Sequence, residues 1–323
     1  MSGIGKHSRS RASSKRRIPS ILTSTPPDSV SDGETRTQSN GGVIGRNQLI
    51  IGGIAVAIVM VLVLVIGISI GINQGKKSKQ TLPETQAQAY DDLQRVKDKP
   101  TNSTEEGGLP AYRETQRNSE APTVEIYEDF LCPYCGDLTR ALAPTLEKLQ
   151  EARQINLEFH IVNLYDTPST NRYATRAANA VAYVSEHDAK HVTAFVGALF
   201  AKDFQPDAVH YKDVSDKQIA AQAQKAGVSR DVAEAAVKAP YASFISKATV
   251  YDTKRKELFT DMNDSKGFFP PTIRINGKVS KLNTTDNDGK IIQRFITNLG
   301  LRIPDVGVPS ELPTIGPDTS YED

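Results

Sequence analysis

The stretch Cys132-Pro133-Tyr134-Cys135 contains both cysteines of this chain of 323 residues. A metal centre usually needs four ligands and a disulfide framework needs more pairs, so this isolated pair indicates redox chemistry. Residues 122–127 are rich in strand formers, and residues 136–150 are expected to form a helix. The free backbone N–H groups and the dipole at a helix N-terminus stabilise a thiolate, the reactive species in disulfide exchange.

The two ends of the chain differ in charge, although the net charge is only +1. Residues 1–48 carry an excess of Lys and Arg, lack apolar periodicity and are predicted to form a disordered basic tail. Residues 303–323 hold four prolines and five acidic residues, and we predict a disordered acidic tail there. The near-neutral balance gives no sign of a nucleic-acid partner.

Residues 49–72 are an uncharged apolar run of 24 residues. As a helix this run spans about 36 Å, enough for a bilayer core of about 30 Å, whereas the apolar region of a cleavable signal peptide is shorter, roughly 7–15 residues. We therefore predict one transmembrane helix, retained as a signal anchor in the lipid bilayer. The larger positive excess precedes it, which predicts a cytoplasmic N-terminus and an extracytoplasmic position for residues 73–323.

The remainder of the chain divides into a linker and one domain. Residues 73–120 are polar and are predicted to be a flexible linker, with at most a marginal helix over residues 85–97. Residues 121–302 show globular patterning. The elements predicted after the first strand and helix are an alternating strand over 154–162, a helical block over 169–262, a hairpin over 272–282 and a helix over 290–299.

This order of elements is that of an α/β, thioredoxin-like fold with an all-helical insertion over 169–262, preceded by one transmembrane helix. The stretch 129–135 resembles the active site of DsbA-like thiol–disulfide oxidoreductases, and Phe269-Pro270-Pro271-Thr272 resembles their cis-proline loop. The resemblance covers about residues 121–301. It implies a membrane-anchored bacterial enzyme that introduces or exchanges disulfides in exported proteins.

The resemblance also implies roles for individual residues. Cys132 is the expected exposed nucleophile, Cys135 the resolving cysteine, and Pro271 the cis-proline beside them. No metal and no cofactor other than the redox-active disulfide is expected. The expected partners are exported cysteine-containing proteins and a membrane-embedded thiol oxidase that reoxidises the enzyme.

The residues between the two cysteines, Pro133 and Tyr134, are expected to modulate the redox potential. The best-known members have a histidine where Tyr134 stands, and a tyrosine cannot carry a positive charge. Pro-Tyr is the dipeptide of many glutaredoxins. We therefore predict a weaker oxidant, with a potential nearer the glutaredoxin range of about −200 to −230 mV than the value of about −120 mV for DsbA.

Three residues are candidates for substrate binding: Phe130, Pro270 and Thr272. The resemblance implies that the residue before the cis-proline pairs its backbone with an extended substrate. Pro270 has no backbone N–H, so one hydrogen-bond donor is missing and looser docking of substrates is predicted.

Relatives often carry a buried acid six positions before the first cysteine, where this chain has Ile126. Glu128 and Asp129 are the candidates to replace that acid in proton transfer. His160, on the second strand, is interpreted as a solvated residue on the outer face. Two alternative functions remain open: a thiol reductase for cytochrome or metal-protein assembly, and a tethered binding module whose disulfide is structural.

Overall fold

In a computed structural model of the chain, residues 85–112, 114–262, 265–280, 282 and 286–316 are described. The predicted basic tail, the predicted transmembrane helix over 49–72 and the first part of the linker lie outside these residues. Of the helices within the described ranges, none has the length and apolar character needed to cross a membrane.

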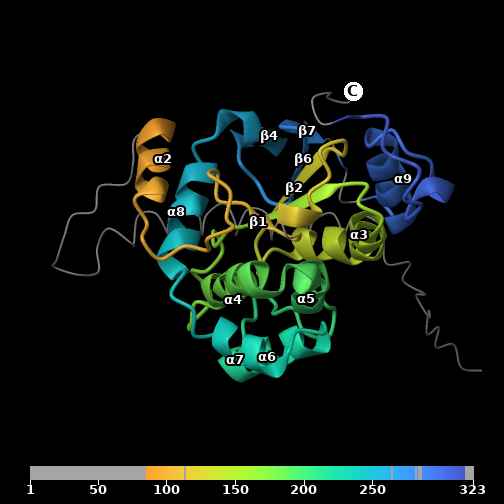
Figure 1. Cartoon of the computed structure of the whole chain (residues 1–323). Coiled ribbons are helices and arrows are strands. Elements are labelled where there is room, and N and C mark those ends of the chain that lie inside the picture. Colours follow the sequence, from red (N-terminus) through yellow and green to blue (C-terminus); the bar gives the residue numbers. More distant parts are fainter. Residues whose placement is uncertain (1–84, 113, 263–264, 281, 283–285, 317–323) are drawn as a thin grey trace, which may run out of the picture. The chain divides into compact units, whose positions relative to one another are not determined.

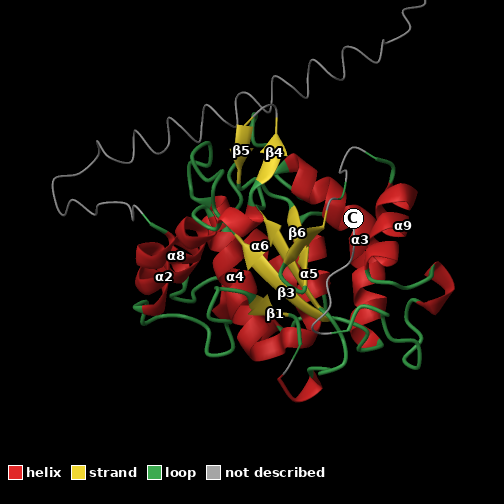
Figure 2. Cartoon of the chain, turned by 90° about the horizontal axis from the view of Figure 1, so that it is seen from above, coloured by secondary structure: helices red, strands yellow, loops and turns green. Residues whose placement is uncertain are grey.

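A five-stranded sheet forms the centre of the described part (Figures 1 and 2), with the strand order β1-β3-β2-β6-β7. β2 and β3 run parallel, and every other neighbouring pair runs antiparallel. A separate two-stranded ribbon is formed by β4 and β5. The strands are β1 (Leu109–Pro110), β2 (Thr123–Glu128), β3 (Asn156–Ile161), β4 (Thr260–Met262), β5 (Ser265–Gly267), β6 (Thr272–Ile275) and β7 (Lys278–Ser280).

The helices follow the order expected from the sequence, with the helical insertion between β3 and β6. They are α2 (Gln86–Gln94), α3 (Pro133–Glu151), α4 (Tyr173–Asp188), α5 (Val192–Leu199), α6 (Asp216–Lys225), α7 (Arg230–Ala236), α8 (Ala242–Asp252) and α9 (Asp288–Asn298). The short 3-10 helices are η1 (Glu114–Gln116), η2 (Ala189–His191), η3 (Lys256–Leu258) and η4 (Ile303–Asp305). The predicted insertion was expected to be entirely helical, but its last residues form β4.

The predicted hairpin is present between β6 and β7. Asn276 and Gly277 occupy its turn with φ angles of 48° and 79°. Both angles lie in the left-handed region that glycine adopts without steric cost, and this turn type matches the twist of antiparallel strands. The hairpin places β7 at one edge of the sheet.

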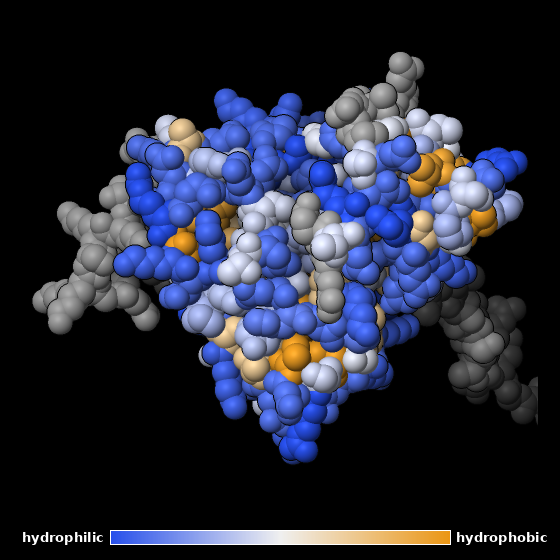
Figure 3. Space-filling model, in the orientation of Figure 1, coloured by the Kyte–Doolittle hydropathy of each residue, from blue (hydrophilic) through white to orange (hydrophobic). Residues whose placement is uncertain are grey.

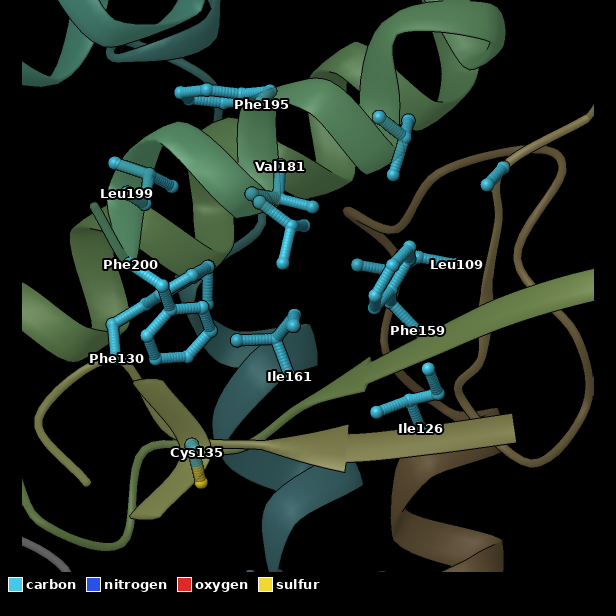
Figure 4. Close-up of a cluster of buried hydrophobic side chains, with 14 of the residues drawn as sticks. Leu109, Ile126, Phe130, Cys135, Phe159, Ile161, Val181, Phe195, Leu199 and Phe200 are labelled. Atoms are coloured by element: carbon cyan, nitrogen blue, oxygen red, sulfur yellow. The ribbon is translucent and has the colours of Figure 1, made fainter. Parts of the chain in front are cut away.

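One face of the sheet is apolar and packs on the helical insertion. The inward residues of the two central strands are Val124, Ile126, Leu157, Phe159 and Ile161, all buried. Figure 4 shows Ile126, Phe159 and Ile161 facing side chains of α4 and α5 such as Val181 and Leu199. This shared core explains why the insertion stays fixed against the sheet that carries the cysteines.

The opposite face of the sheet is polar and also buried, which corrects the interpretation of His160 as a solvated residue. Only 2% of the surface of His160 is exposed, and its ring stacks on Tyr127 with 4.2 Å between ring centroids. The alternating pattern identified the face of the strand, but it could not show that other segments cover this face too. One of these segments contains Gly108, whose backbone lies against the His160 ring.

Residues 85–112 belong to the folded domain, which corrects part of the predicted flexible linker. α2 packs against α8 with Leu93 buried, and β1 adds Leu109 to the sheet. Between these two elements, the Glu106 carboxylate accepts hydrogen bonds from Arg255 (2.6 Å) and Arg274 (3.3 Å). The segment is polar in sequence because it contributes few core residues. The residues that those few core residues contact are distant in sequence, so only the tertiary structure shows the contacts.

The predicted acidic tail is likewise ordered as far as the structure describes it. Ile315 is buried, and the side-chain amide of Gln154 donates to the carbonyls of Asp305 (2.9 Å) and Val308 (3.2 Å). A proline-rich segment has few N–H groups and cannot pair its carbonyls within a regular strand or helix. The side chain of Gln154 donates hydrogen bonds to two of these carbonyls instead.

The surface is mainly hydrophilic on the face that Figure 3 shows, with several small separate apolar patches. Among the described residues, the large apolar side chains that are exposed are Val209, Ile303 and Val308. The apolar residues of the described part are therefore concentrated in the core that supports the redox motif.

Candidate active site

The two cysteines lie at the junction between β2 and α3, as predicted. Cys132 is the N-cap residue of α3 in an extended conformation, and Pro133 is the first helical residue. Proline suits this position because its fixed φ matches the helix and its missing N–H would have been unpaired there. The amide of Cys132 donates to the Asp129 carbonyl (2.9 Å), and that of Gly136 donates to the Cys132 carbonyl (3.2 Å).

Both thiols are buried, which corrects the expectation that Cys132 is exposed. Only 2% of the surface of Cys132 is exposed, and that of Cys135 is fully covered. The Cys132 Sγ lies 3.5 Å from the carbonyl oxygen of Pro270. The proline loop, which comes from the far end of the chain, therefore covers the nucleophile.

The peptide bond between Pro270 and Pro271 is cis, so Pro271 occupies the predicted cis-proline position. The next residue, Thr272, begins β6 and pairs with Tyr127 of β2. This pairing places the proline loop beside the end of β2, from which the chain continues to Cys132. The catalytic role of Pro271 remains a prediction.

The three predicted substrate-binding residues have different positions. Phe130 is fully buried and its ring lies 4.8 Å from that of Phe200, so its side chain is part of the core (Figure 4). Thr272 is also buried, and its hydroxyl donates to the Phe269 carbonyl (2.9 Å). Neither side chain is exposed in this conformation, and the role of Phe130 and Thr272 in substrate binding remains a prediction. Pro270 contacts Cys132 through its carbonyl, as described above.

Pro133 and Tyr134 lie at the rim of the site. Pro133 is exposed, and Tyr134 is half-buried against the core. Their effect on the redox potential remains a prediction.

A buried carboxyl group, that of Glu128, lies beneath the cysteine pair at the end of β2. Burial raises the pKa of Glu128 to about 8, although a hydrogen bond from the Thr139 hydroxyl of α3 opposes this shift. One carboxyl oxygen accepts from Thr139, and the other, Oε2, is buried without a hydrogen-bond partner among the described residues. Ile126, at the position where relatives carry their acid, is an apolar core residue.

Asp129, the second candidate acid, has a different environment. Its carboxylate accepts hydrogen bonds from the backbone amides of Leu131 (2.8 Å) and Tyr165 (2.9 Å). Burial raises the pKa of Asp129 to about 7, and these two bonds oppose the shift. Both oxygens of Asp129 are thus engaged with the backbone of the loop before the cysteines, whereas Glu128 has one oxygen without a hydrogen-bond partner among the described residues.

Burial raises the pKa of the Cys135 thiol well above its usual value. A hydrogen bond with Cys132 and the charge of Glu128 raise this pKa further. Cys135 therefore holds its proton, and Glu128 is close enough to act on that proton electrostatically. The two cysteines thus have different surroundings, and their roles as nucleophile and resolving cysteine remain predictions.

One residue at the site was not identified from the sequence. The side-chain amide of Gln205, in the helical insertion, donates to the Cys132 carbonyl (2.9 Å). A single glutamine in a polar loop gives no signal in a sequence, because its importance depends on which backbone it reaches in space.

Comparison with known proteins identifies the family to which this arrangement belongs. A family profile described as thioredoxin matches residues 116–294, which is more than half of the chain. The chain belongs to this thioredoxin family. The match includes β2, both cysteines, the helical insertion and the cis-proline loop, so the predicted thioredoxin-like fold with a helical insertion is confirmed.

Several solved structures resemble this thioredoxin-family chain. Reduced DsbA from Mycobacterium tuberculosis is 22% identical, and the match covers 63% of this chain and 98% of that protein with a TM-score of 0.49. A reduced disulfide bond oxidoreductase, DsbG, from the same organism is 21% identical, with 70% of this chain and 99% of that protein covered and a TM-score of 0.49.

Among curated proteins, the serine/threonine-protein kinase PknE of Mycobacterium tuberculosis is 33% identical over 97 residues. The match covers 29% of this chain and 17% of the kinase, so the similarity concerns a short part of that protein.

Proposed function

We propose that this chain is a protein thiol–disulfide oxidoreductase that introduces or exchanges disulfides through Cys132 and Cys135. The observation that carries the proposal is the environment of Cys135. Its thiol is buried against Cys132 and within the electrostatic influence of Glu128, a buried carboxyl that has one oxygen free of hydrogen bonds. A disulfide that is only structural does not require a titratable carboxyl beneath it.

The reaction begins with the Cys132–Cys135 disulfide. A substrate thiolate attacks the Cys132 sulfur, a mixed disulfide forms, and the bond to Cys135 breaks. Cys135 leaves with the electron pair as a thiolate and takes up a proton. Because the pKa of Glu128 is about 8, this carboxyl is protonated at neutral pH and supplies the proton.

The second step releases the substrate. A second substrate thiolate attacks the substrate sulfur of the mixed disulfide, and Cys132 leaves as a thiolate at the N-terminus of α3. The substrate has then lost two electrons to form its disulfide, and the enzyme holds them as the Cys132 thiolate and the Cys135 thiol. The two substrate protons were released to water when the substrate thiols ionised, and Glu128 takes up a proton from water again. A membrane-embedded thiol oxidase, which takes up the two electrons, is the proposed partner that restores the disulfide.

We propose that the domain lies outside the cytoplasm and acts on exported cysteine-containing proteins. The charge asymmetry around the apolar run over 49–72 supports this orientation, and disulfides persist in such compartments. Residues 73–84 lie between the predicted membrane helix and Thr85, the first residue that the structure describes. Fully extended, they reach about 40 Å, which keeps the site near the membrane surface and its reoxidising partner.

The test is to trap substrates on Cys132. In the full-length chain with Cys135→Ser, a mixed disulfide at Cys132 cannot be resolved within the enzyme, so partners stay attached and are seen on non-reducing gels. The matched control is the double variant Cys132→Ser and Cys135→Ser, which must trap nothing. Many trapped exported proteins support the proposal, whereas one or two assembly proteins favour the reductase. An empty trap would show that the pair is structural and that the chain is a binding module.

A further inference from the structure

The helical insertion contacts the backbone of the nucleophile through Gln205, which lies in the loop between α5 and α6. Its side-chain Nε2 donates to the carbonyl of Cys132 at 2.9 Å and to that of Phe130 at 3.4 Å. These two carbonyls belong to the loop that carries the reactive sulfur. The insertion therefore holds this loop by hydrogen bonds as well as by apolar packing.

The amide of Gln205 is held at its other end as well. Its Oε1 accepts a hydrogen bond from the Arg140 guanidinium of α3 at 3.0 Å. The same nitrogen of Arg140 donates to the Phe200 carbonyl at 2.6 Å, and its other nitrogen pairs with Asp137 at 2.5 Å. The orientation of the amide is thus determined, with its N–H groups toward Cys132 and its oxygen toward the cation.

Gly136 provides the space for this arrangement. A Cβ atom at this position would lie 2.0 Å from the Oε1 of Gln205 and 2.6 Å from a guanidinium nitrogen of Arg140. Glycine inside a helix costs about 1 kcal/mol relative to alanine. A glycine directly after Cys135 is consistent with a requirement for close approach of the Gln205 side chain.

We infer that Gln205 is a positioning residue for Cys132, through which the helical insertion sets the reactivity of the redox pair. This inference rests on the proposed function. The amide N–H groups face two carbonyl oxygens near the sulfur and offset their negative ends, which favours the Cys132 thiolate. A favoured thiolate makes the disulfide easier to reduce, so Gln205 makes the enzyme a stronger oxidant than its Pro-Tyr dipeptide alone would.

The experiment uses Gln205→Leu, which keeps the approximate size of the side chain and removes its donors. Two properties of the full-length chain in detergent are measured: the rate of Cys132 alkylation by iodoacetamide as a function of pH, with the modified cysteine identified by mass spectrometry, and the redox equilibrium with glutathione. The free energy of one neutral hydrogen bond corresponds to a change of about three- to tenfold in an equilibrium constant. We expect alkylation at pH 7 to be slower by about this factor and the disulfide to be harder to reduce, a tenfold change being about 30 mV.

Gly136→Ala tests the same contact by another route. The added methyl group displaces the end of the flexible Gln205 side chain, and alanine favours the helix, so the fold should be retained. We expect the same decrease in alkylation rate, and no further decrease when both substitutions are combined. This variant decides the question if Gln205→Leu does not fold.

The matched control is Gln150→Leu, at the other end of the same helix. Gln150 donates to the Ala111 carbonyl and accepts from Thr193 of α5 at 2.6 Å, so it too joins α3 to the insertion. It lies about 27 Å from Cys132 along the helix, and we expect its loss to leave the alkylation profile unchanged.

Two results would overturn the inference. The first is an unchanged alkylation profile in both Gln205→Leu and Gly136→Ala. The second is an equal change in Gln150→Leu, because general loosening of the insertion would then be the cause. Failure of the proposed function is distinguishable: the wild-type chain would form no reversible disulfide with glutathione, whereas the alkylation comparison would still be informative.

Discussion

The carbonyl oxygen of Pro270 lies 3.5 Å from the Sγ of Cys132, although the two residues are 138 positions apart in the chain. Residue 270 has no backbone donor for a substrate because the proline nitrogen carries no hydrogen, and its backbone acceptor, the carbonyl, faces the thiol. The loop can cover the nucleophile, but it offers an extended substrate only part of the pairing that a non-proline residue would allow.

Restoring the missing donor should tighten substrate docking. We expect Pro270→Thr to bind an extended peptide about three- to tenfold more tightly, because one backbone hydrogen bond is added. The measurement is the Kd of a serine-containing peptide that cannot form a mixed disulfide. Pro304→Thr, at an exposed proline of η4, serves as the control and should leave the Kd unchanged. Equal affinities of wild type and Pro270→Thr would contradict the prediction.

Tyr134 should keep the enzyme a weaker oxidant than DsbA. Replacing it with histidine adds a group that can carry a positive charge beside Cys132, and we expect the redox potential to rise by about 30 mV or more, a tenfold change in the equilibrium with glutathione. Tyr134→Phe is the control, since phenylalanine also lacks a positive charge. A wild-type potential already near about −120 mV would disprove the idea.

The buried carboxyl of Glu128 should make stability depend on pH. Its pKa is about 8 in the folded chain, above its ordinary value of 4.5, so the unfolded chain loses this proton first as the pH rises. The carboxyl therefore destabilises the fold progressively between about pH 4.5 and pH 8. We expect a loss on the order of 3 kcal/mol between pH 5 and pH 9.

Urea unfolding of Glu128→Gln at these two pH values checks this expectation. Glutamine cannot ionise, so the difference between pH 5 and pH 9 should shrink by the amount that Glu128 contributes. Glu151→Gln replaces an exposed carboxyl at the end of α3 and should behave as wild type. If Glu128→Gln lost as much stability with rising pH as wild type, Glu128 would not be the titrating group.

Arg255 should be essential to the polar face of the sheet. Its side chain is fully buried and donates to Glu106 (2.6 Å), to Asp252 (3.4 Å) and to the Tyr127 hydroxyl (3.0 Å). Arg255→Met removes the cation paired with the buried Asp252, whereas Glu106 and the Tyr127 hydroxyl keep their contacts with Arg274. We expect the free energy of unfolding to fall by about 3–5 kcal/mol.

The comparison is Arg230→Met, which removes an exposed ion pair with Glu234 one helical turn away. Such pairs contribute about 0.3–0.5 kcal/mol. Urea unfolding of both variants should therefore separate a large loss from a small one, and similar losses would argue against the buried network.

The segment before β2 should be needed for stability, contrary to the expectation of a flexible linker. Leu109 in β1 is fully buried, and we expect Leu109→Ala to lower the free energy of unfolding by about 2–5 kcal/mol. Val209→Ala removes a side chain that is 56% exposed and should cost far less. Equal effects of the two substitutions in urea unfolding would indicate that residues 85–112 are a flexible linker after all.

Local sequence signals were sufficient for the chemistry and for the order of the elements. The cysteine spacing, the strand before it and the helix after it placed the redox pair, because strand and helix periodicities and a helix N-terminus are local properties. The Asn276–Gly277 turn was predictable for the same reason, since its backbone angles suit these residue types. The cis-proline position and the unequal roles of the cysteines came from the family resemblance.

The tertiary structure decided what depends on contacts between distant segments. The burial of Cys132 results from the proline loop, and the elevated pKa of Glu128 results from the closure of α3 over the end of β2. The hydrogen bond from Gln205 joins the insertion to the nucleophile, and the buried network of Arg255 brings an apparently polar linker into the fold. Burial and electrostatic environment are sums over neighbours in space, and sequence periodicity reports only which face of an element a residue occupies.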